Sequence, residues 1–465
     1  MIVRSPALLI ALSILAATLA GEESRSYFVD AVNGSDFNPG TSSAPWKTIQ
    51  KAADRIAAGS VAHVRAGKYN ERVIVTRSGS RGAFITFNAH GNVVMQGFTI
   101  YANYVRVIGF EMTNSIITSP HGAGVAVLGR FNEIRNNYIH DLLLGEGIWL
   151  IGGPNQLAGF TSNNTVAGNR IVRARVAGIL VEGTNNLIED NDISHTIQNP
   201  PGAPPRPGAD ADGIRFFGSG HTFRHNYIHD VTLKDVGNTD PHIDAFQTWG
   251  PSSNMIIEEN MMWQMESPDQ GVTIEGPLQP VGNITIRNNV IMTSGTGYAP
   301  AVLAGDSGQV TNVNIVNNTM VALNGPSEYA IRLFANLGGA VVKNNAIYDH
   351  GNSSTPYIRI DAGASGLDVG FNSISKSDNG APAGPLYPGD LWMVNPEFVN
   401  FSRHDFHLQS ASPLINAGTP LSMVRIDFAG RLRPHGGPYD IGAFQHRNTR
   451  ISHGDEPQYR ERPEH

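Results

Sequence analysis

The segments FRHNYI at residues 223–228, IEENMM at 257–262 and IRNNVI at 286–291 follow one template: an apolar residue, two free positions, Asn, one free position and a second apolar residue. The template recurs through the middle of the chain, and its asparagines are Asn137, Asn169, Asn191, Asn226, Asn260, Asn289, Asn318, Asn345 and Asn372. Successive asparagines are 22 to 35 residues apart. A series of this period is typical of a stacked repeat array.

Short strands of alternating apolar and polar residues, repeated at this period, predict coils stacked on one another. The apolar residues of each coil would fill the interior, and Asn side chains at equivalent bends would hydrogen-bond from coil to coil. We therefore predict an all-β fold, a parallel β-helix (solenoid) over about residues 60–375. Its nine asparagines should lie in one or two rows along the long axis.

Composition agrees with a β-rich chain that has many turns. Only 16% of the 465 residues are charged, and the chain contains 51 Gly and 28 Pro. A net charge of −7 argues against a basic surface for nucleic acid. The absence of cysteine excludes disulfides and thiolate chemistry.

The chain divides into four segments. Residues 1–20 combine a basic residue with a short apolar run, which predicts a signal peptide, secretion to an extracellular or periplasmic space and no stable membrane insertion. Residues 21–385 form the predicted β-helix with an N-terminal cap, where helical spacing over Thr48–Ala57 predicts a short helix over the open end. Residues 386–446 lose the repeat and are predicted to be a C-terminal capping segment, and the polar residues 447–465 a disordered tail. We expect a monomer.

The repeat, together with the segment VRAGKY at residues 64–69, resembles the right-handed pectin-lyase-like β-helix superfamily. The resemblance covers most of the mature chain and implies a right-handed parallel β-helix. It does not specify an activity, because this superfamily includes lyases, hydrolases, epimerases and phage proteins.

Two columns of residues on the first strand of each coil change character in the middle coils. Aligned on the small residue that begins the strand, the preceding positions are Ala123, Glu146, Ala177, Asp212, Asp244, Gln270, Pro300 and Tyr329. The positions two residues after it are Ala126, Trp149, Leu180, Arg215, Gln247, Thr273, Leu303 and Arg332. Stacking would place Asp212 and Asp244 about 4.8 Å apart. The polar middle of both columns predicts a site, and a solvated polar face is the alternative.

Further acidic residues precede these strands, at the ends of two long insertions that would flank the site. In an extended chain Asp210 shares a face with Asp212, and Asp240 and His242 share a face with Asp244. Clustered carboxylates repel one another unless a cation or a shared proton joins them. Hard oxygen ligands favour Ca²⁺, which we predict at Asp210, Asp212 and Asp244. The alternative is that each Asp caps a turn.

Two closer resemblances bear on the chemistry. Clustered Asp residues on neighbouring coils resemble the calcium-dependent pectate lyases of polysaccharide lyase family nine, which implies a calcium role for Asp210, Asp212 and Asp244. This sequence departs from that family because no Lys occupies the strand of the next coil.

The tripeptide Asp240-Pro241-His242 is similar to the Asp-Pro-His motif of the alginate C5-epimerases. This similarity implies catalytic roles for Asp240 and His242. The acidic residue that follows the motif directly in those enzymes is delayed here by Ile243.

Both enzyme classes begin by removing the C5 proton of a uronate, a step that requires neutralisation of the sugar carboxylate. Ca²⁺ or Arg215 could neutralise it, and His242 is the predicted base, with Lys234 or Arg215 as alternatives. The predicted substrate-binding residues are Gln247, Trp249, Gln270 and Glu275. We predict a secreted polysaccharide lyase that acts by C5 proton abstraction and β-elimination on an acidic, pectate- or alginate-like polysaccharide.

Three alternatives stay open. A mannuronan-type C5-epimerase differs mainly in whether the leaving group departs. A glycoside hydrolase would use Asp212 and Asp244, and a separation near 5 Å would imply retention of configuration. A non-catalytic surface β-helix that binds glycan would have these side chains pointing apart. His221, His225 and His229 lie on another face, and we predict structural roles for them.

Overall fold

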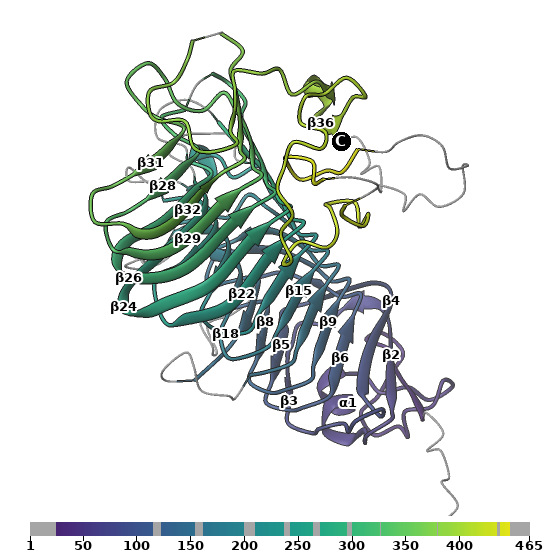
Figure 1. Ribbon diagram of the computed structural model, residues 1–465. Coiled ribbons are helices and arrows are strands. Elements are labelled where there is room, and N and C mark those ends of the chain that lie inside the picture. The colour runs from purple at the N-terminus through teal and green to yellow at the C-terminus, as the bar shows by residue number, and fades with distance from the viewer. Residues whose placement is uncertain are drawn as a thin grey trace, which may run out of the picture.

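The computed structural model describes residues 25–114, 122–153, 161–199, 210–236, 242–263, 270–294, 300–325, 327–378, 380–434 and 438–446. In these ranges the chain winds into stacked coils, and each strand pairs in parallel with the equivalent strands of the coils before and after it (Figure 1). The predicted parallel β-helix is therefore confirmed. The predicted signal peptide and the predicted tail lie outside the described residues.

Three sheets run along the stack. The first sheet contains β3 (Arg72–Val75), β5 (Gly97–Ile100), β8 (Val125–Val127), β11 (Ile148–Leu150), β14 (Val176–Val181), β17 (Ala211–Phe216), β21 (Asp244–Thr248), part of β24 (Gln270–Arg287), part of β26 (Val302–Val316), β28 (Ile331–Leu333) and β31 (Ile358–Ile360).

The second sheet contains β1 (Ser26–Val29), β2 (Val61–Lys68), β4 (Ile85–Met95), β6 (Val105–Ile108), β9 (Glu133–Arg135), β12 (Thr165–Ala167), β15 (Leu187–Glu189), β18 (Gly218–Ser219), β19 (Thr222–Arg224), β22 (Ser252–Glu258), the rest of β24 and β26, β29 (Leu337–Lys343) and β32 (Ser365–Gly370). The third sheet contains β7 (Glu111–Met112), β10 (Tyr138–Leu142), β13 (Arg170–Ala174), β16 (Asp192–Ser194), β20 (Tyr227–His229), β23 (Met261–Trp263), β25 (Val290–Thr293), β27 (Thr319–Ala322), β30 (Ala346–Tyr348), β33 (Ser373–Ser375) and β34 (Leu391–Trp392).

The nine predicted asparagines form one continuous row at the bend between the second and third sheets. Nδ2 of Asn226 donates to Oδ1 of Asn260 at 3.0 Å, and the same bond repeats from Asn137 to Asn372. The row ends at Asp390, whose Oδ1 accepts from the main-chain N–H of Asn372 at 2.8 Å. All nine side chains are buried, so the row satisfies polar groups that water cannot reach.

The residue before each ladder asparagine has a positive φ, which bends the chain sharply between the two sheets. These residues are Asn136, Gly168, Asp190, His225, Glu259, Asn288, Asn317, Asn344 and Phe371, with φ between 53° and 66°. Seven of the nine are Asn, Asp, His or Gly, which enter this left-handed region more readily than other residues, and the exceptions are Glu259 and Phe371. The local sequence preference and the coil-to-coil hydrogen bonds therefore favour the same bend.

A second, shorter row lies at the bend between the first and second sheets. The main-chain N–H of Asn132 donates to Asn164 Oδ1, that of Asn164 to Asn186 Oδ1, and that of Asn186 to Nδ1 of His221 at 3.1 Å. His221 is fully buried, and burial lowers its pKa to about 4, so its imidazole is neutral and can accept this bond. His221 thus has the structural role that its position predicted.

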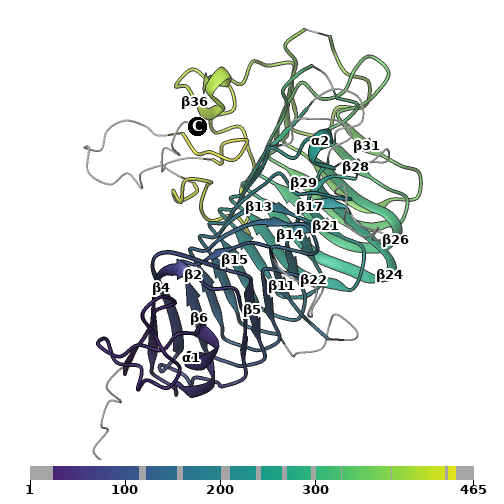
Figure 2. The same cartoon turned by 180° about the vertical axis from the view of Figure 1, so that it is seen from behind.

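A short helix lies at the N-terminal end of the stack (Figure 2). It is α1 (Ile49–Arg55), and its N-cap Thr48 accepts a hydrogen bond from the N–H of Lys51 at 3.1 Å. The helix buries Ile49, Ala52 and Ala53 against the end of the core. The predicted capping helix is confirmed, and it ends two residues before the predicted boundary.

The C-terminal segment first continues the last coil and then turns back along the side of the stack. β34 pairs with β33, after which β35 (Phe398–Asn400) and β36 (Asp405–Leu408) form an antiparallel pair joined by the 3-10 turn η1 (Phe401–Arg403). The segment's apolar side chains Phe398, Phe406, Leu408, Leu414, Ile441, Ala443 and Phe444 pack on Val290, Met292, Val321 and Ala346 of the third sheet. The segment predicted to cap the C-terminal end therefore also covers one side of the coils (Figure 1).

None of the helices in the described ranges has the length and apolar character needed to cross a membrane.

Candidate active site on the first sheet

A glycine at the start of β17 determines which side chains face outward. A Cβ at Gly213 would lie 2.4 Å from Cγ2 of Ile228 and 2.7 Å from the carbonyl oxygen of Ala245, so this position faces the interior and excludes any larger residue. The next residue, Ile214, also packs in the core. Asp212 and Arg215, on either side of this pair, therefore meet on the outer surface of the first sheet.

The predicted columns are confirmed by the strand register. Ile214 pairs with Phe246, which places Asp212 and Asp244 at equivalent positions on adjacent coils. The same register pairs Arg215 with Gln247, and the next coil adds Thr273 and Gln270 to the two columns.

Arg215 is held by two carboxylates and an indole ring. Its Nη2 lies 2.5 Å from Oδ2 of Asp210 and 2.7 Å from Oδ2 of Asp212, and its Nε also donates to Asp212. The guanidinium carbon lies 4.4 Å from the centre of the Trp249 ring, which suits a cation–π contact. Trp249 also packs edge-on against Phe217. Trp249 therefore orients Arg215, and its ring is half-buried.

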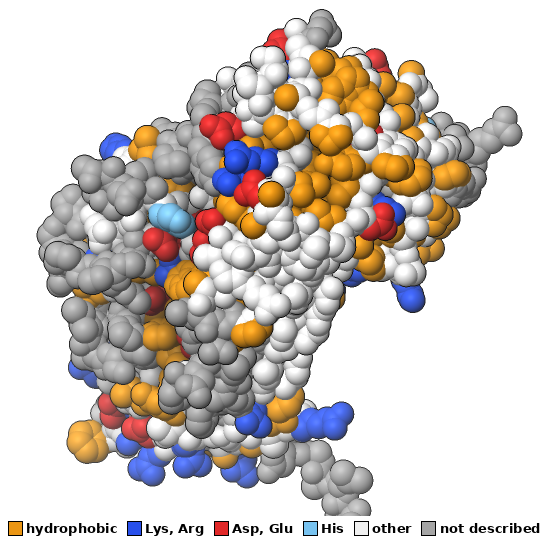
Figure 3. Space-filling model, turned by 60° about the vertical axis from the view of Figure 1, so that its left-hand side comes forward, with side chains coloured by type: hydrophobic (Ala, Val, Ile, Leu, Met, Phe, Trp, Pro, Cys, Tyr) orange, Lys and Arg blue, Asp and Glu red, His pale blue; other side chains and the backbone are white. Residues whose placement is uncertain are grey.

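His242 lies on the opposite side of the same carboxylates. Its Nδ1 is 3.1 Å from Oδ2 of Asp244 and 3.9 Å from Oδ1 of Asp210. The Asp212 and Asp244 side chains are fully buried, whereas the His242 side chain is 43% exposed. His242 is therefore accessible to solvent, and Asp212 and Asp244 lie beneath Arg215 and His242. On the face shown in Figure 3, a histidine lies beside acidic side chains in a hollow of the surface.

Burial and charge change the protonation of this cluster. The close approach and the negative charge of Asp244 raise the pKa of His242 to about 10, although burial opposes the shift. Burial also raises the pKa of Asp210, and that of Asp212 well above its usual value, against the attraction of Arg215. In this arrangement His242 is an imidazolium at neutral pH.

Thr273, on the next coil, lies between two acceptors of the cluster. Its Oγ1 is 2.5 Å from Oδ1 of Asp244 and 2.6 Å from Oε1 of Gln270, so the one hydroxyl proton can be donated to only one of them at a time.

Glu275 and Asp306 are a second pair of acidic residues near the cluster. Burial and the neighbouring charges of Asp306 and Asp244 raise the pKa of Glu275 to about 7. The sequence did not indicate Asp306, because the register between β24 and β26 shifts just beyond Ile274.

Ligand atoms of Asp210, Asp212 and His242 lie within 4.8 Å of one another, which is close enough to hold a metal ion. Among the described residues, Oδ1 of Asp212, Nδ1 of His242, Oδ2 of Asp244 and Oε1 of Gln247 are buried without a well-aligned hydrogen-bond partner, as ligands of a metal ion would be. His242 takes the place that we predicted for Asp244 in this group, and it would bind an ion only as the free imidazole, so that ion binding would release its proton. A mixed oxygen and nitrogen set suits several divalent ions, whereas Ca²⁺ prefers oxygen alone.

Two predicted catalytic residues are not placed in this cluster. Asp240 lies outside the described residues. Lys234 is exposed on α2 (Leu233–Val236), where the adjacent Asp235 pairs with Arg173 and His195. In the parts of the chain that the structure describes, no recorded contact joins Lys234 to the cluster.

His225 and His229 also lie away from the cluster. Nε2 of His225 pairs with Glu259 at 2.9 Å, and His229 bridges Asp192 at 3.0 Å and Asp230 at 2.7 Å. These contacts join neighbouring coils and match the structural roles we predicted.

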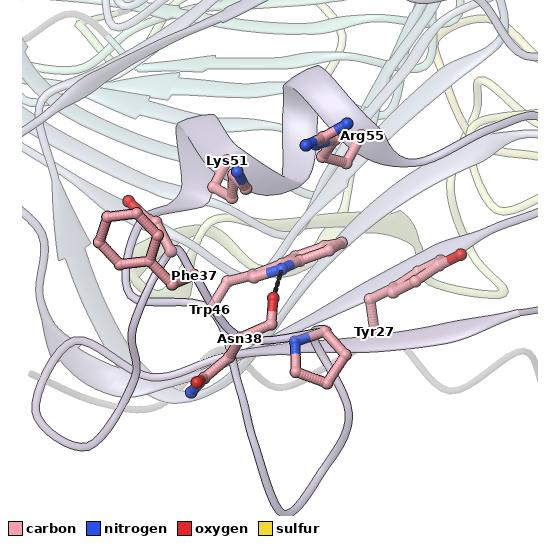
Figure 4. Close-up of a pocket in the computed structure, with 8 residues that line it drawn as sticks. Tyr27, Phe37, Asn38, Trp46, Lys51 and Arg55 are labelled. Atoms are coloured by element: carbon pink, nitrogen blue, oxygen red, sulfur yellow. Dashed lines mark hydrogen bonds between the residues drawn. The ribbon is translucent and has the colours of Figure 1, made fainter.

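A separate cavity of about 400 Å³ lies at the N-terminal cap and not at the cluster (Figure 4). Lys51 and Arg55 of α1 line it together with Tyr27 and Trp46, whose rings stack at 5.0 Å. The Trp46 Nε1–H donates to the carbonyl oxygen of Asn38 at 2.8 Å, which fixes the indole in the wall.

Comparisons with known proteins agree with this architecture. Residues 96–230 and 160–347 match a family described as right handed beta helix region, and residues 32–76 match a family described as a protein of unknown function. The uncharacterized protein YwoF of Bacillus subtilis (strain 168) is 40% identical over 86 residues. That segment is 18% of this chain and 18% of YwoF, so the match spans a small part of either protein.

Two solved structures share the fold over most of their length. Pectate lyase Pel9A superposes with a TM-score of 0.50 at 18% identity, over 91% of this chain and 97% of that one. XylC, solved in complex with xylose, superposes with a TM-score of 0.58 at 13% identity, over 90% and 98%. Identities this low establish the fold and not the activity. Because the matched repeat region, residues 96–347, is more than half of the 465 residues, this protein belongs to the right-handed β-helix family.

Proposed function

We propose that this protein is a secreted polysaccharide lyase that acts on a uronate-containing glycan. The observation that supports this most is the convergence of Arg215 and His242 over buried carboxylates on adjacent coils. Arg215, whose partners fix it before substrate arrives, can bind a sugar carboxylate without reorganising, and His242 beside it is left for proton transfer. Gln247 adds a neutral amide at the position next to Arg215.

Elimination would proceed at C5 and C4 of the uronate. A base removes the C5 proton, the electron pair forms the C4–C5 double bond, the C4–O4 bond breaks, and O4 takes a proton. The C5 proton becomes acidic enough when the adjacent carboxylate is neutralised, a role suited to Arg215 and Gln247. Asp212, which is fully buried, would position Arg215 and not touch the sugar.

His242 is the group best placed for proton transfer. Its Nδ1 is buried 3.1 Å from Asp244, which leaves Nε2 as the ring atom available to substrate. As the free imidazole it would take the C5 proton, and as the imidazolium it would protonate O4. The pKa of about 10 favours the imidazolium in the free protein.

A divalent cation, for which we propose Ca²⁺, would be held by Asp210 and Asp212, which lie close together and include a buried oxygen without a partner among the described residues. Bound there, it would supply further positive charge for the sugar carboxylate.

A glycoside hydrolase is the second candidate. The pKa of about 7 at Glu275 suits a general acid, and Asp244 lies close enough to contribute to that shift. The predicted pair of Asp212 and Asp244 is less suited to this role, because Asp212 is already paired with Arg215 and Asp244 with His242.

The test is a screen of the purified protein on pectate, alginate and glycosaminoglycans, with and without added Ca²⁺. A lyase produces an unsaturated sugar, which is followed by its ultraviolet absorbance. New reducing ends without this absorbance would indicate a hydrolase and contradict the proposal. A change in C5 configuration by nuclear magnetic resonance without chain cleavage would indicate an epimerase instead.

A further inference from the structure

The second column of the first sheet continues past the cluster to a pair of arginines. In register, it consists of Arg215, Gln247, Thr273, Leu303, Arg332 and Arg359. Arg332 is on β28 and Arg359 on β31, which follow β21 along the same face of the stack (Figure 2). The arginine pair therefore lies on the sheet that carries His242 and Arg215.

One carboxylate serves both arginines. Oδ2 of Asp361 accepts from Nε and Nη2 of Arg332 at 3.1 and 2.9 Å, and Oδ1 accepts from Nε of Arg359 at 3.0 Å. The group keeps one net positive charge. The two terminal nitrogens of Arg359 have no recorded partner among the residues that the structure describes, so its outer edge can receive another carboxylate.

Aromatic rings support the pair from below. The guanidinium carbon of Arg332 lies 4.0 Å from the ring centre of Phe334, and those of Arg332 and Arg359 both lie 5.9 Å from that of Tyr329. Tyr329 and Phe334 are buried with Leu303 in one apolar cluster. The Arg359 side chain is 44% exposed, so this packed apolar cluster supports a guanidinium group that solvent and ligands can reach.

We propose that Arg359, supported by Arg332, is a subsite that binds a carboxylate of an acidic polysaccharide lying along the first sheet. The subsite rests on the proposed function, because it extends the same bound chain. Four strand steps separate β21 from β31, about 19 Å at the spacing of paired strands. A pyranose residue is comparable in length with one such step, so a trimer bound at His242 does not reach Arg359, whereas a heptamer with four of its sugars on that side does.

The column between the two cationic positions is neutral, since Gln247, Thr273 and Leu303 carry no charge. Positive charge at two separated points suits a polymer that repeats its negative charge, and a neutral glycan would gain nothing from it.

The test compares Arg359→Gln with Arg224→Gln. Arg224 is a matched control: its side chain is 41% exposed and pairs with Glu189 at 2.8 Å, but it belongs to β19 of the second sheet. Both changes are made in the His242→Gln background, so that oligomers are not consumed during titration. Calorimetry then gives Kd for trimers and heptamers of galacturonate and of mannuronate.

Arg359→Gln should weaken heptamer binding about three- to tenfold, the range for an exposed charge-assisted contact, and leave trimer binding unchanged. Added salt should reduce the difference. Equal weakening of trimer and heptamer, an equal effect of Arg224→Gln, or no binding of either heptamer to the parent would overturn the subsite.

The subsite and the lyase activity can fail separately. If Arg359→Gln weakens the binding of heptamer but not of trimer, and the otherwise unaltered protein forms no unsaturated product, the subsite stands and the lyase proposal fails. If product forms and Arg359→Gln binds heptamer like its parent, the lyase proposal stands and the subsite fails.

Discussion

Asn226→Ala tests the asparagine row at its centre. The Asn226 side chain takes part in four hydrogen bonds: Oδ1 accepts from N and Nδ2 of Asn191 at 3.2 and 3.0 Å, and Nδ2 donates to Ile188 O at 2.9 Å and to Asn260 Oδ1 at 3.0 Å. The residue is 1% exposed, so water cannot replace these bonds in the native state.

The cost follows from the number of bonds. A buried hydrogen bond contributes about 0.5–1.5 kcal/mol net, so the loss of four should destabilise the protein by about 2–6 kcal/mol. Asn314→Ala is the control, because its half-buried side chain makes one recorded bond, from Nδ2 to Oγ1 of Thr285 at 3.2 Å. That single bond predicts a loss of about 0.5–1.5 kcal/mol.

Urea unfolding, followed by circular dichroism, gives the midpoint and slope for each variant and hence the free energy of unfolding. If Asn226→Ala costs no more than Asn314→Ala, the row does not hold the coils together, and packing of the apolar interior must do so alone.

Three further predictions concern the candidate site. His242→Gln should abolish turnover and leave polyuronate binding within about threefold, because a proton-transfer group acts on the transition state; full activity would remove His242 from the mechanism. The raised pKa of His242, about 10 against an ordinary 6.5, means that its contribution to stability is complete below pH 6.5 and is lost as pH rises through 10. The melting temperature of the parent protein should therefore fall relative to that of His242→Gln over this range, and a constant difference would contradict the assigned shift. Asp210→Asn should weaken the binding of a divalent cation measured by calorimetry at least tenfold, whereas the same change at the distant, exposed Asp378 should not; equal binding by both variants would exclude the metal group.

The fold could be predicted because each coil repeats a local requirement. A residue that tolerates positive φ, followed by a buried Asn, is specified within a few positions, so the pattern survives changes in coil length. The stacking of Asp212 and Asp244 was predictable for a similar reason: Gly213 fixes the alignment of its strand with the next.

The details of the site depend on contacts between coils, which the linear sequence does not show. The buried Asp212 is bound by Arg215, and Arg215 in turn stacks on Trp249, which comes from the next coil. The same limit applies to the C-terminal segment: its packing on the third sheet uses hydrogen bonds such as that from Asn317 Nδ2 to Asp440 O at 3.1 Å, between residues more than a hundred positions apart.

Because the register is regular, the stack can become longer or shorter by whole coils. Val290 and Thr319 are partners in adjacent coils, each directly after a ladder asparagine, so a duplication of residues 290–318 would insert one coil and keep every later residue in phase. His242 and the pair of Arg332 and Arg359 would then move apart by about 4.8 Å. If both positions bind one polysaccharide, as we propose, recombination at asparagine codons would change the preferred length of that polymer by about one sugar.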